Sequence, residues 1–444
     1  MAYESKYKAM LTDSRSAVEQ IGSDSIVAIG QAVCQPPALM EALAARAEAA
    51  NIDNVKVYYM HAEENMKRSL LRYELMGRIK PYCMFIQEAE RDLIKKGQQD
   101  GDRKVVYYVP NSFSQSVRFF TEHIHVDTFL VTVSKMDRNG YFTFGTNNDY
   151  TSTAARSAKR LIVEVNRHMP RVYGRSALHI SEVDAIVEND APLLTLTPRP
   201  IQDHERQLGQ RIAELIPEYA CLQIGVGGVP SGVCEALMNR NDLGIHTEVL
   251  NPALALLIQN GVVTNRWKTI NPGKSVFTFA MGDEAFYDFM NDNIAIESHP
   301  VNYVNDPAVI AQNDNVVSVN STIEMDLTGA CNSEYVNGHQ FTSTGGQLDF
   351  VRGSYASKGG MSFIAFQSAI KDGKISKIVP RLSGPVTTPR TDVHYVVTEN
   401  GVANLKGLSS TERAQALIAL AHPAFQDGLT AAPRRITCCE SEEF

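Results

Sequence analysis

Hydrophobic and polar positions follow two patterns along the first part of the chain, one typical of strands and one typical of helices. Residues 25–30 and 54–61 are short apolar runs that predict strands, and residues 38–50 show the spacing of an amphipathic helix. Pro36 and Pro37 precede this helix, where proline suits the first turn. The order strand, helix, strand predicts a parallel pair joined by a crossover helix. The residues expected on the buried face of the helix are Leu39, Met40, Leu43 and Ala47.

The same order returns near the middle of the chain. Residues 220–224 predict a strand, the glycine-rich segment 225–230 follows, a helix begins at about Ser231, and residues 243–250 run into another strand. This repetition indicates two related α/β domains with mainly parallel sheets. Any two strand–helix–strand units share this order of elements, however, so the pattern alone leaves the relatedness of the two halves open.

A proline-rich connector separates the halves. The chain of 444 residues is too long for one ordinary core. Residues 188–203 hold three prolines and little helical periodicity, which suits an extended connector. We therefore predict an N-terminal α/β domain over residues 1–195 and a C-terminal α/β domain over residues 196–444.

Charge restricts the partners that the protein can bind. Hydrophobic residues make up 44% of the chain and charged residues 21%, which is typical of a packed globular protein. The 42 Lys and Arg against 50 Asp and Glu give a net charge of −8, and nonspecific nucleic-acid binding needs a basic face instead. An anionic ligand would therefore need a local basic patch or backbone N–H groups.

The sequence favours a cytoplasmic protein without a membrane span or a metal site. No apolar stretch approaches the length of a span, and no apolar run near the N-terminus would serve as a signal peptide. The seven cysteines are odd in number and match neither a zinc site nor a redox pair, so we expect reduced thiols. The histidines are scattered, and none lies at zinc-ligand spacing from another ligand.

Three segments are candidates for chemistry. Glycines in the segment 225–230 would let the backbone approach a ligand at a helix N-terminus, although a tight structural turn explains them equally well. Glu248, two residues after His246 in a predicted strand, is awkward beside apolar neighbours unless it is paired, functional or at an edge in water. The third segment, 344–353, again begins with glycines, and structural turns account for it as well as catalysis does.

Taken together, several segments resemble the family I coenzyme A transferases, in the acetyl-CoA hydrolase/transferase group. The chain is most similar to the 4-hydroxybutyrate and butyryl-CoA:acetate CoA-transferases of that group, from about Ile26 to the region of His422 and Pro423. The segments that carry the resemblance occur in the family order, at 133–150, 164–171, 304–307, 323–329, 345–353 and 386–394.

The resemblance implies two tandem α/β domains with the active site between them, and an acyl-CoA:carboxylate CoA-transferase. In the family a glutamate attacks the acyl thioester and becomes a glutamyl-CoA thioester, and Glu248 matches it. By the same resemblance Gly346 supplies a backbone donor to the reacting carbonyl. The residues expected to bind the substrate and CoA are Gly225, Val226, Gly227, Gly228, Asn320, Gly345 and Gln347.

The resemblance also implies the partners. We expect acyl-CoA and a short carboxylate such as acetate as substrates, CoA as a substrate rather than a bound cofactor, and a homodimer or higher homo-oligomer. The enzyme would belong to acetyl-CoA and short-chain fatty acid metabolism. An acyl-CoA hydrolase and a catalytically impaired acyl-CoA-binding protein are the alternatives, and Glu63 and Glu64 are the rival nucleophiles.

Two segments depart from the family pattern. Residues 249–253 read Val-Leu-Asn-Pro-Ala where the family usually shows Met-Phe-Ser-Asp-Gly, and Ala330-Cys331-Asn332 replaces the commoner Gln-Val-Asn. We expect the first departure to bear on substrate preference, because it follows the candidate nucleophile directly.

Overall fold

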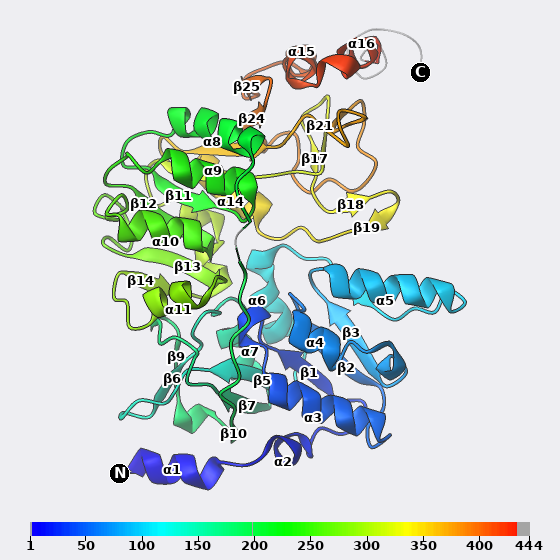
Figure 1. Ribbon diagram of the computed structural model, residues 1–444, viewed down its shortest axis with the longest axis vertical. Helices are drawn as coiled ribbons and strands as arrows, with labels where there is room; N and C mark the ends of the chain where they lie inside the picture. The colour runs from blue at the N-terminus through cyan, green and yellow to red at the C-terminus, as the bar shows by residue number, and fades with distance from the viewer. Residues whose placement is uncertain (1, 198, 433–444) are drawn as a thin grey trace. The chain divides into compact units, whose positions relative to one another are not determined.

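The structure, a computed structural model, describes residues 2–197 and 199–432 and divides into two compact units (Figure 1). Unit 1 comprises the described residues up to 197 together with Thr247–Ala255 and Lys274–Asn305. Unit 2 comprises Arg199–His246, Leu256–Gly273 and the described residues from Asp306 onward. Cys438 and Cys439 lie outside the described residues, within which the other five cysteines are buried and form no disulfide.

Unit 1 is built on a seven-stranded sheet in which every strand runs parallel to its neighbours. The strands in spatial order are β10 (Ala185–Glu188), β7 (Arg160–Val165), β5 (Thr128–Val133), β1 (Ile26–Ile29), β2 (Val55–Tyr59), β3 (Ile79–Cys83) and β4 (Tyr107–Tyr108). The unit also holds the parallel strands β13 (Ser275–Ala280), β14 (Ile296–Ser298) and β8 (Tyr173–Gly174), and the antiparallel pair β6 (Tyr141–Thr143) and β9 (Ala177–His179).

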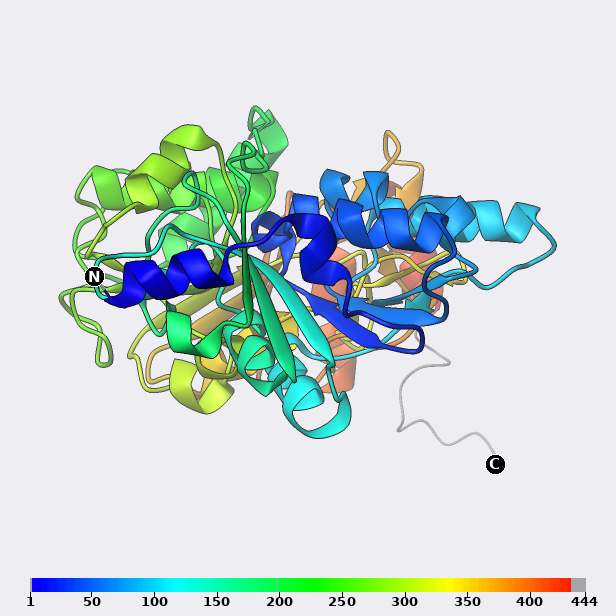
Figure 2. The same cartoon turned by 90° about the horizontal axis from the view of Figure 1, so that it is seen from below.

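Helix α3 (Pro37–Glu48) joins β1 to β2 and covers one face of this sheet (Figure 2). Its residues Leu39, Met40, Leu43 and Ala47 are wholly buried, as predicted, in a core with Val27 and Val57 of the strands. The other helices of unit 1 are α1 (Ala2–Met10), α2 (Ser14–Val18), α4 (Glu64–Arg68), α5 (Glu88–Gln99), α6 (Ser116–Arg118), α7 (Thr151–Ser157), α11 (Glu284–Met290) and α12 (Val301–Val304). Short 3₁₀ or π turns are η1 (Ala32–Cys34), η2 (Tyr73–Leu75), η3 (Phe113–Gln115), η4 (Phe119–His123) and η5 (Ile180–Glu182).

Unit 2 repeats this arrangement. Its main strands, in spatial order, are β25 (Gly401–Asn404), β24 (Tyr395–Thr398), β20 (Met361–Ala365), β15 (Val316–Asn320), β11 (Cys221–Ile224) and β12 (Gly244–Leu250). Only the pair of β24 and β25 among these is antiparallel. The boundary between the two units falls within β12, after His246.

The helices of unit 2 lie between and beside these strands. They are α8 (Asp203–Leu215), α9 (Gly228–Ala236), α13 (Pro307–Ile310), α14 (Gln347–Ala356), α15 (Ser410–Leu420) and α16 (Pro423–Ala431), and α10 (Pro252–Gln259) begins in unit 1 and ends in unit 2. The short strands are β16 (Glu324–Asp326), β17 (Cys331–Asn332), β18 (Tyr335–Val336), β19 (His339–Gln340), β21 (Ala369–Ile370), β22 (Ile375–Ser376) and β23 (Ile378–Val379).

The two strand–helix–strand motifs confirm the predicted α/β fold with mainly parallel sheets in both halves. β1, α3 and β2 correspond to β11, α9 and β12, with both strand pairs parallel and a third parallel strand, β5 or β15, on the other side of the first. The predicted strands match β1, β2, β11 and β12, and α9 begins three residues before the predicted start. That earlier start follows from Gly228, which already has helical geometry and leads directly into Val229 and Pro230.

The connector after β10 has no helix or strand in its described residues until α8 begins at Asp203. The predicted domain boundary at residues 195 and 196 stays a prediction, because compactness also assigns 247–255 and 274–305 to unit 1. Within the described residues, no helix combines the length and the apolar character that crossing a bilayer requires.

Candidate active site

Glu248 lies near the carboxyl end of β12, with its side chain partly buried. Asn305, which is wholly buried, donates a hydrogen bond from Nδ2 to Glu248 Oε2 at 2.6 Å. Asn305 is held in turn at the end of α12, where its backbone N–H donates to Val301 O at 2.9 Å. A donor fixed on one carboxylate oxygen restrains the orientation of the side chain, as a nucleophilic carboxylate requires.

The residues that follow Glu248 build the local structure that supports it. Val249 and Leu250 are buried, and Asn251 Oδ1 accepts from the Leu254 N–H at 3.0 Å at the start of α10. Pro252 occupies the first turn of that helix, where a missing N–H costs no hydrogen bond. The unusual segment 249–253 therefore forms a strand end and a helix cap. Its bearing on substrate preference stays a prediction.

The glycine segment forms the turn between β11 and α9. Gly227 has a φ of 126°, which favours glycine, and Val226 is 62% exposed although it is apolar. Gly228 has a different reason to be glycine, because a Cβ there would lie 1.9 Å from the Glu205 carboxylate of α8. Arg199 pairs with that carboxylate, donating to Glu205 Oε2 at 2.9 Å. Gly228 is thus a packing glycine, whereas Gly225, Val226 and Gly227 form the exposed part of the turn.

Asn320 lies at the carboxyl end of β15, beside this turn. Its Nδ2 donates to Gln223 Oε1 at 3.1 Å, and β15 pairs in parallel with β11, with Val319 opposite Ile224. The Gly225 N–H also approaches Val319 O at 3.4 Å. The structure therefore brings the glycine turn and Asn320 together at the carboxyl ends of two neighbouring parallel strands, where ligands bind in open α/β sheets.

The second glycine segment begins helix α14. Gly345 has a φ of 60°, Gly346 is the residue that precedes the helix, and Gln347 is its first residue. Gln347 Nε2 donates to Thr388 Oγ1 at 3.0 Å, which anchors the start of the helix. The first N–H groups of a helix lack partners within it, so this segment can donate to a developing oxyanion. Gly345, Gly346, Gln347 and the glycine turn all belong to unit 2, whereas Glu248 and Asn305 belong to unit 1.

The rival glutamates have different surroundings. Glu63 precedes α4 directly, and burial together with the nearby Glu90 carboxylate raises its pKa to about 7. A carboxyl with so high a pKa is a weaker nucleophile at neutral pH, because a large part of it is protonated. Glu64 is exposed and pairs with Arg68 one helical turn later, which is the ordinary state of a surface residue.

Sequence reasoning missed Asn305 and a polar cluster at the carboxyl ends of β1 and β2. Gln31 Nε2 and His61 Nδ1 lie 3.0 Å apart, and Gln35 Nε2 donates to His61 O at 2.5 Å. Burial lowers the pKa of His61 to about 4, so its ring is neutral at pH 7. The available signals were a polar residue directly after the predicted strand 25–30, Gln31, and a polar residue at the end of the predicted strand 54–61, His61. Asn305 was signalled only as part of the family-like segment 304–307.

Within residues 2–197 and 199–432, no three His, Cys, Asp or Glu side chains are grouped as a metal ion would need. The chemistry that these residues themselves offer is a held carboxylate on β12 and backbone donors at a helix start.

Comparison with known proteins identifies a family. The model of the acetyl-CoA hydrolase/transferase N-terminal domain matches residues 1–198, and that of the acetyl-CoA hydrolase/transferase C-terminal domain matches residues 282–432.

Relatives match over nearly the full length. The succinyl-CoA:cyclohexane-1-carboxylate CoA transferase of Geobacter metallireducens is 41% identical, over 98% of this chain and 97% of its own. The 4-hydroxybutyrate coenzyme A transferase of Clostridium kluyveri is 40% identical, over 97% of this chain and 98% of its own. The crystal structure of RipA from Yersinia pestis is 55% identical, with a TM-score of 0.94 over 98% of this chain and 99% of its own.

Proposed function

The chain belongs to the acetyl-CoA hydrolase/transferase family and is a CoA-transferase, and on this basis we propose that Glu248 carries CoA between a short-chain acyl-CoA and a carboxylate such as acetate. The observation that carries the proposal is the contact of the Glu248 carboxylate with a buried amide, Asn305, at the carboxyl end of a strand. A partly buried glutamate is expected to have a hydrogen-bond partner or a catalytic role, because burying an unpaired charge costs free energy.

The transfer proceeds by exchange of acyl bonds. The Glu248 carboxylate attacks the thioester carbonyl and displaces CoA thiolate, which leaves a mixed anhydride. The thiolate then attacks the glutamyl carbonyl, releases the donor carboxylate and leaves a glutamyl-CoA thioester. An acceptor carboxylate reverses both steps and departs as the new acyl-CoA. No net proton transfer is needed, and one difficult exchange becomes several easier ones.

Each step places negative charge on a carbonyl oxygen, and we assign Gly346 to stabilise it. Gly346 is the N-cap residue of α14, where helix geometry leaves backbone N–H donors without helical partners. Loss of one such donor typically costs about 3–4 kcal/mol of transition-state stabilisation. The residues proposed to contact CoA and the acyl group are Gly225, Val226, Gly227, Gly228, Asn320, Gly345 and Gln347.

The polar cluster of unit 1 supports an acyl group with a polar substituent. Gln31 is wholly buried, and its Oε1 has no hydrogen-bond partner among the described residues. The ring of its neighbour His61 lies 5.8 Å from that of Phe279, which is on β13, the strand next to β12. A hydroxyl group could donate to Gln31 Oε1 there. A panel of acyl-CoA donors against short carboxylates, with butyryl-CoA and 4-hydroxybutyryl-CoA compared directly, tests this preference.

We further propose that the enzyme uses no permanently bound cofactor, that it works as a homodimer or higher homo-oligomer, and that it serves short-chain fatty acid metabolism in the cytoplasm. CoA enters and leaves as a substrate. The site has to exclude water during the reaction, because anhydride and thioester intermediates hydrolyse.

The decisive variant is Glu248→Gln, which keeps the shape of the side chain and its contact with Asn305 but removes the nucleophile. We expect it to abolish CoA transfer while circular dichroism and thermal unfolding remain near those of the unchanged protein. Glu63→Gln is the matched control and should retain transfer. Full activity of the Glu248 variant would eliminate the nucleophile assignment.

A second experiment locates the intermediate directly. Incubation with acyl-CoA and borohydride should reduce the glutamyl thioester, and peptide mass spectrometry should find the change at Glu248. A label at Glu63 or Glu64 would move the site. Rates with and without acetate then separate transfer from hydrolysis, because a hydrolase would not need the carboxylate acceptor.

A further inference from the structure

A buried turn of unit 1, residues 146–151, has no part in the chemistry described so far. Most of it belongs to the family-like segment 133–150, and all six of its residues are wholly buried although five of them are polar. Connecting segments usually run over the surface, and buried polar groups require hydrogen-bond partners. The partners of this turn therefore indicate what it does in the molecule.

The 146–151 turn is bonded to β13. The backbone N–H groups of Asn148 and Asp149 both donate to Thr278 O, at 2.9 and 3.1 Å, and the Ala280 N–H donates to Thr146 O at 2.8 Å. The strand β13 lies next to β12, which carries the candidate nucleophile. The turn therefore fixes the strand against which the nucleophile strand is placed.

The same turn is bonded to α12. The Val301 N–H at the start of this helix donates to Asp149 O at 3.0 Å, and Asn148 Nδ2 donates to Ser298 O at 2.9 Å just before the helix. At the other end of α12, the Asn305 N–H donates to Val301 O at 2.9 Å. A short chain of backbone hydrogen bonds thus leads from Asp149 to the amide residue that contacts the nucleophile.

The side chain of Asp149 sets the shape of the turn. Its Oδ1 accepts from the Thr151 N–H at 3.0 Å and from Thr151 Oγ1 at 2.8 Å, and its Oδ2 accepts from Asn147 Nδ2 at 3.1 Å. Burial raises the pKa of Asp149 to about 6 in spite of these bonds, so most of it is still ionised at pH 7. A carboxylate only accepts hydrogen bonds, whereas an amide in its place would turn N–H groups toward one of these donors.

We propose that Asp149 is a positioning residue for CoA transfer, which acts through Asn305 to hold the Glu248 carboxylate in the orientation for attack on the thioester. The inference rests on the proposed function, because it gives the contact between Asn305 and Glu248 a part in that attack. Displacement of a reacting group by about 1 Å can cost about a hundredfold in rate. A turn that holds both the strand beside the nucleophile and the helix of its donor therefore affects the rate.

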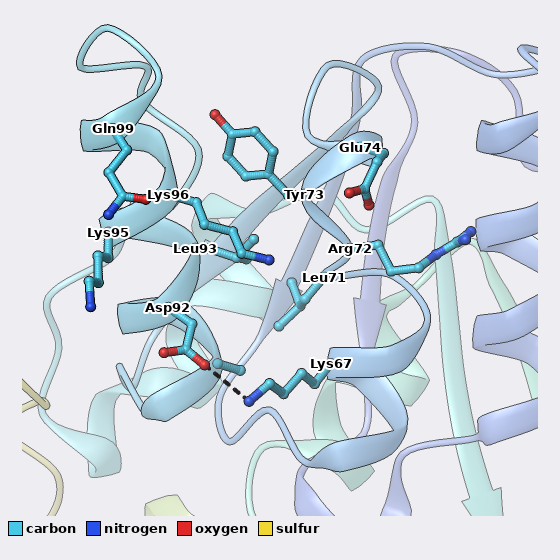
Figure 3. A pocket seen from close by; sticks show the side chains of 11 residues that line it. Lys67, Leu71, Arg72, Tyr73, Glu74, Asp92, Leu93, Lys95, Lys96 and Gln99 are labelled. Carbon is cyan, nitrogen blue, oxygen red and sulfur yellow. Dashed lines mark hydrogen bonds and ion pairs between the residues drawn. The ribbon is translucent and has the colours of Figure 1, made fainter.

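Two other carboxyl groups of unit 1 supply matched controls. Glu164 is also wholly buried, but it accepts from the Leu39 N–H at 3.0 Å and so holds the start of α3. Asp92 is exposed, lines a cavity between α4, η2 and α5, and pairs with Lys67 at 3.1 Å (Figure 3). Glu164→Gln thus controls for the loss of a buried carboxylate, and Asp92→Asn repeats the chemical change of Asp149→Asn at the surface.

The first test is a double-mutant cycle in steady-state kinetics. Asp149→Asn should lower kcat about tenfold with little change in the KM for acyl-CoA. In the Asn305→Ala background the same change should lower kcat by less than about twofold, because the residue through which it acts is gone. An unchanged kcat in the single variant, or a tenfold loss in both backgrounds, would overturn the proposal.

The controls distinguish positioning from a general defect of the fold. Glu164→Gln should change kcat by the same factor in both backgrounds, and Asp92→Asn should leave kcat unchanged. If Asp149→Asn does not fold, Thr151→Val takes its place in the cycle, since it removes one donor to the carboxylate. We then expect a loss of about threefold, which again should vanish in the Asn305→Ala background, and an equal loss there would contradict the proposal.

The second test needs no activity. Hydrogen–deuterium exchange of the peptides that cover residues 298–305 should be faster in Asp149→Asn, because the acceptor of the Val301 N–H moves, and unchanged in Glu164→Gln. Unchanged exchange in a folded Asp149 variant would refute the link between the turn and α12. If Glu248→Gln retained transfer, the proposed function would fail, while the exchange rates would still show whether Asp149 holds this helix.

Discussion

Glutamate carboxyl groups in this protein differ in the groups that contact them and in how deeply they are buried. Glu248 has a buried amide donor, Glu164 accepts from the Leu39 N–H at 3.0 Å and from Asn189, and Glu90 accepts from the Tyr59 hydroxyl. Burial raises the pKa of Glu164 to about 7 in spite of its hydrogen bonds. Three carboxyls of one type therefore have three distinct environments, and only Glu248 sits at a strand end with a donor and partial exposure.

We propose that Asn305 positions the Glu248 carboxylate, and the Asn305→Ala variant tests this role. Removal of a hydrogen bond to a charged group should lower kcat about tenfold to a hundredfold, while KM for acyl-CoA changes little. Asn293→Ala, which removes another side-chain amide of unit 1, should leave kcat near its original value. Steady-state kinetics of both variants give the comparison, and an unchanged kcat in a folded Asn305 variant would refute the role.

Glu63 makes stability depend on pH. Burial, together with the nearby Glu90 carboxylate, raises its pKa from the ordinary 4.5 to about 7 in the folded protein, so the folded state binds the proton more strongly and stability falls as pH rises between these values. The effect is worth about 3 kcal/mol.

Glu63→Gln should remove this dependence. The variant should be more stable than the unchanged protein at pH 8, by up to about 3 kcal/mol, and the advantage should disappear below pH 4.5. Urea unfolding at the two pH values measures it. Glu64→Gln, a neighbouring change at an exposed position, should show no such pattern, and a Glu63 variant that gains nothing at pH 8 would contradict the prediction.

Among the elements, the turn from β11 to α9 combines exposure with tight packing. Gly225 and Gly228 begin and end the same short turn, yet they meet different surroundings. A Cβ on Gly225 would lie 3.6 Å from Val319 O, an ordinary contact, whereas a Cβ on Gly228 would overlap the Glu205 carboxylate. The turn is thus anchored at its helical end and free to contact a ligand at its strand end.

This difference predicts a contrast between two substitutions. Gly228→Ala should reduce the free energy of unfolding by about 1–3 kcal/mol, since Glu205 and helix α8 have to shift. Gly225→Ala should cost much less. Denaturant unfolding of both variants measures the contrast, and equal stability would show that the Glu205 side chain moves aside at no cost.

At the scale of the whole molecule, the two units supply different parts of the proposed chemistry. Unit 1 holds Glu248 and Asn305, and unit 2 holds the two glycine segments. The parallel strands of each unit end in turns and helix starts that present backbone donors and polar side chains at one sheet edge.

The proposed homodimer is also tested at this scale. Light scattering of the purified full-length protein should give about 98 kDa, twice the chain mass of 49.0 kDa, or a higher multiple. The measured mass should not change across a tenfold dilution. A constant mass equal to that of one chain would contradict the proposal.

Part of the fold was predictable from the sequence, because the buried face of a helix or strand requires apolar residues at a regular spacing. The strands around 25–30 and 220–224 and the buried face of α3 are confirmed, since apolar side chains repeat at the period of each element. The start of α9 was placed too late, because Gly228 and Pro230 disguise the first helical turn. Glu248 was singled out for its awkward position in an apolar strand, and the family resemblance gave it a role.

The sequence by itself determined the order of strands and helices, the places where glycine has to stand and the carboxylate most in need of a partner. Only the tertiary structure decided which distant residues contact these elements, glycines and carboxylate. Asn305 donates to Glu248 across 57 residues, and burial together with the Glu90 carboxylate raises the pKa of Glu63. Local periodicity reports which face of an element is buried, but contacts between distant segments depend on the order of strands in the sheets, which no local pattern records.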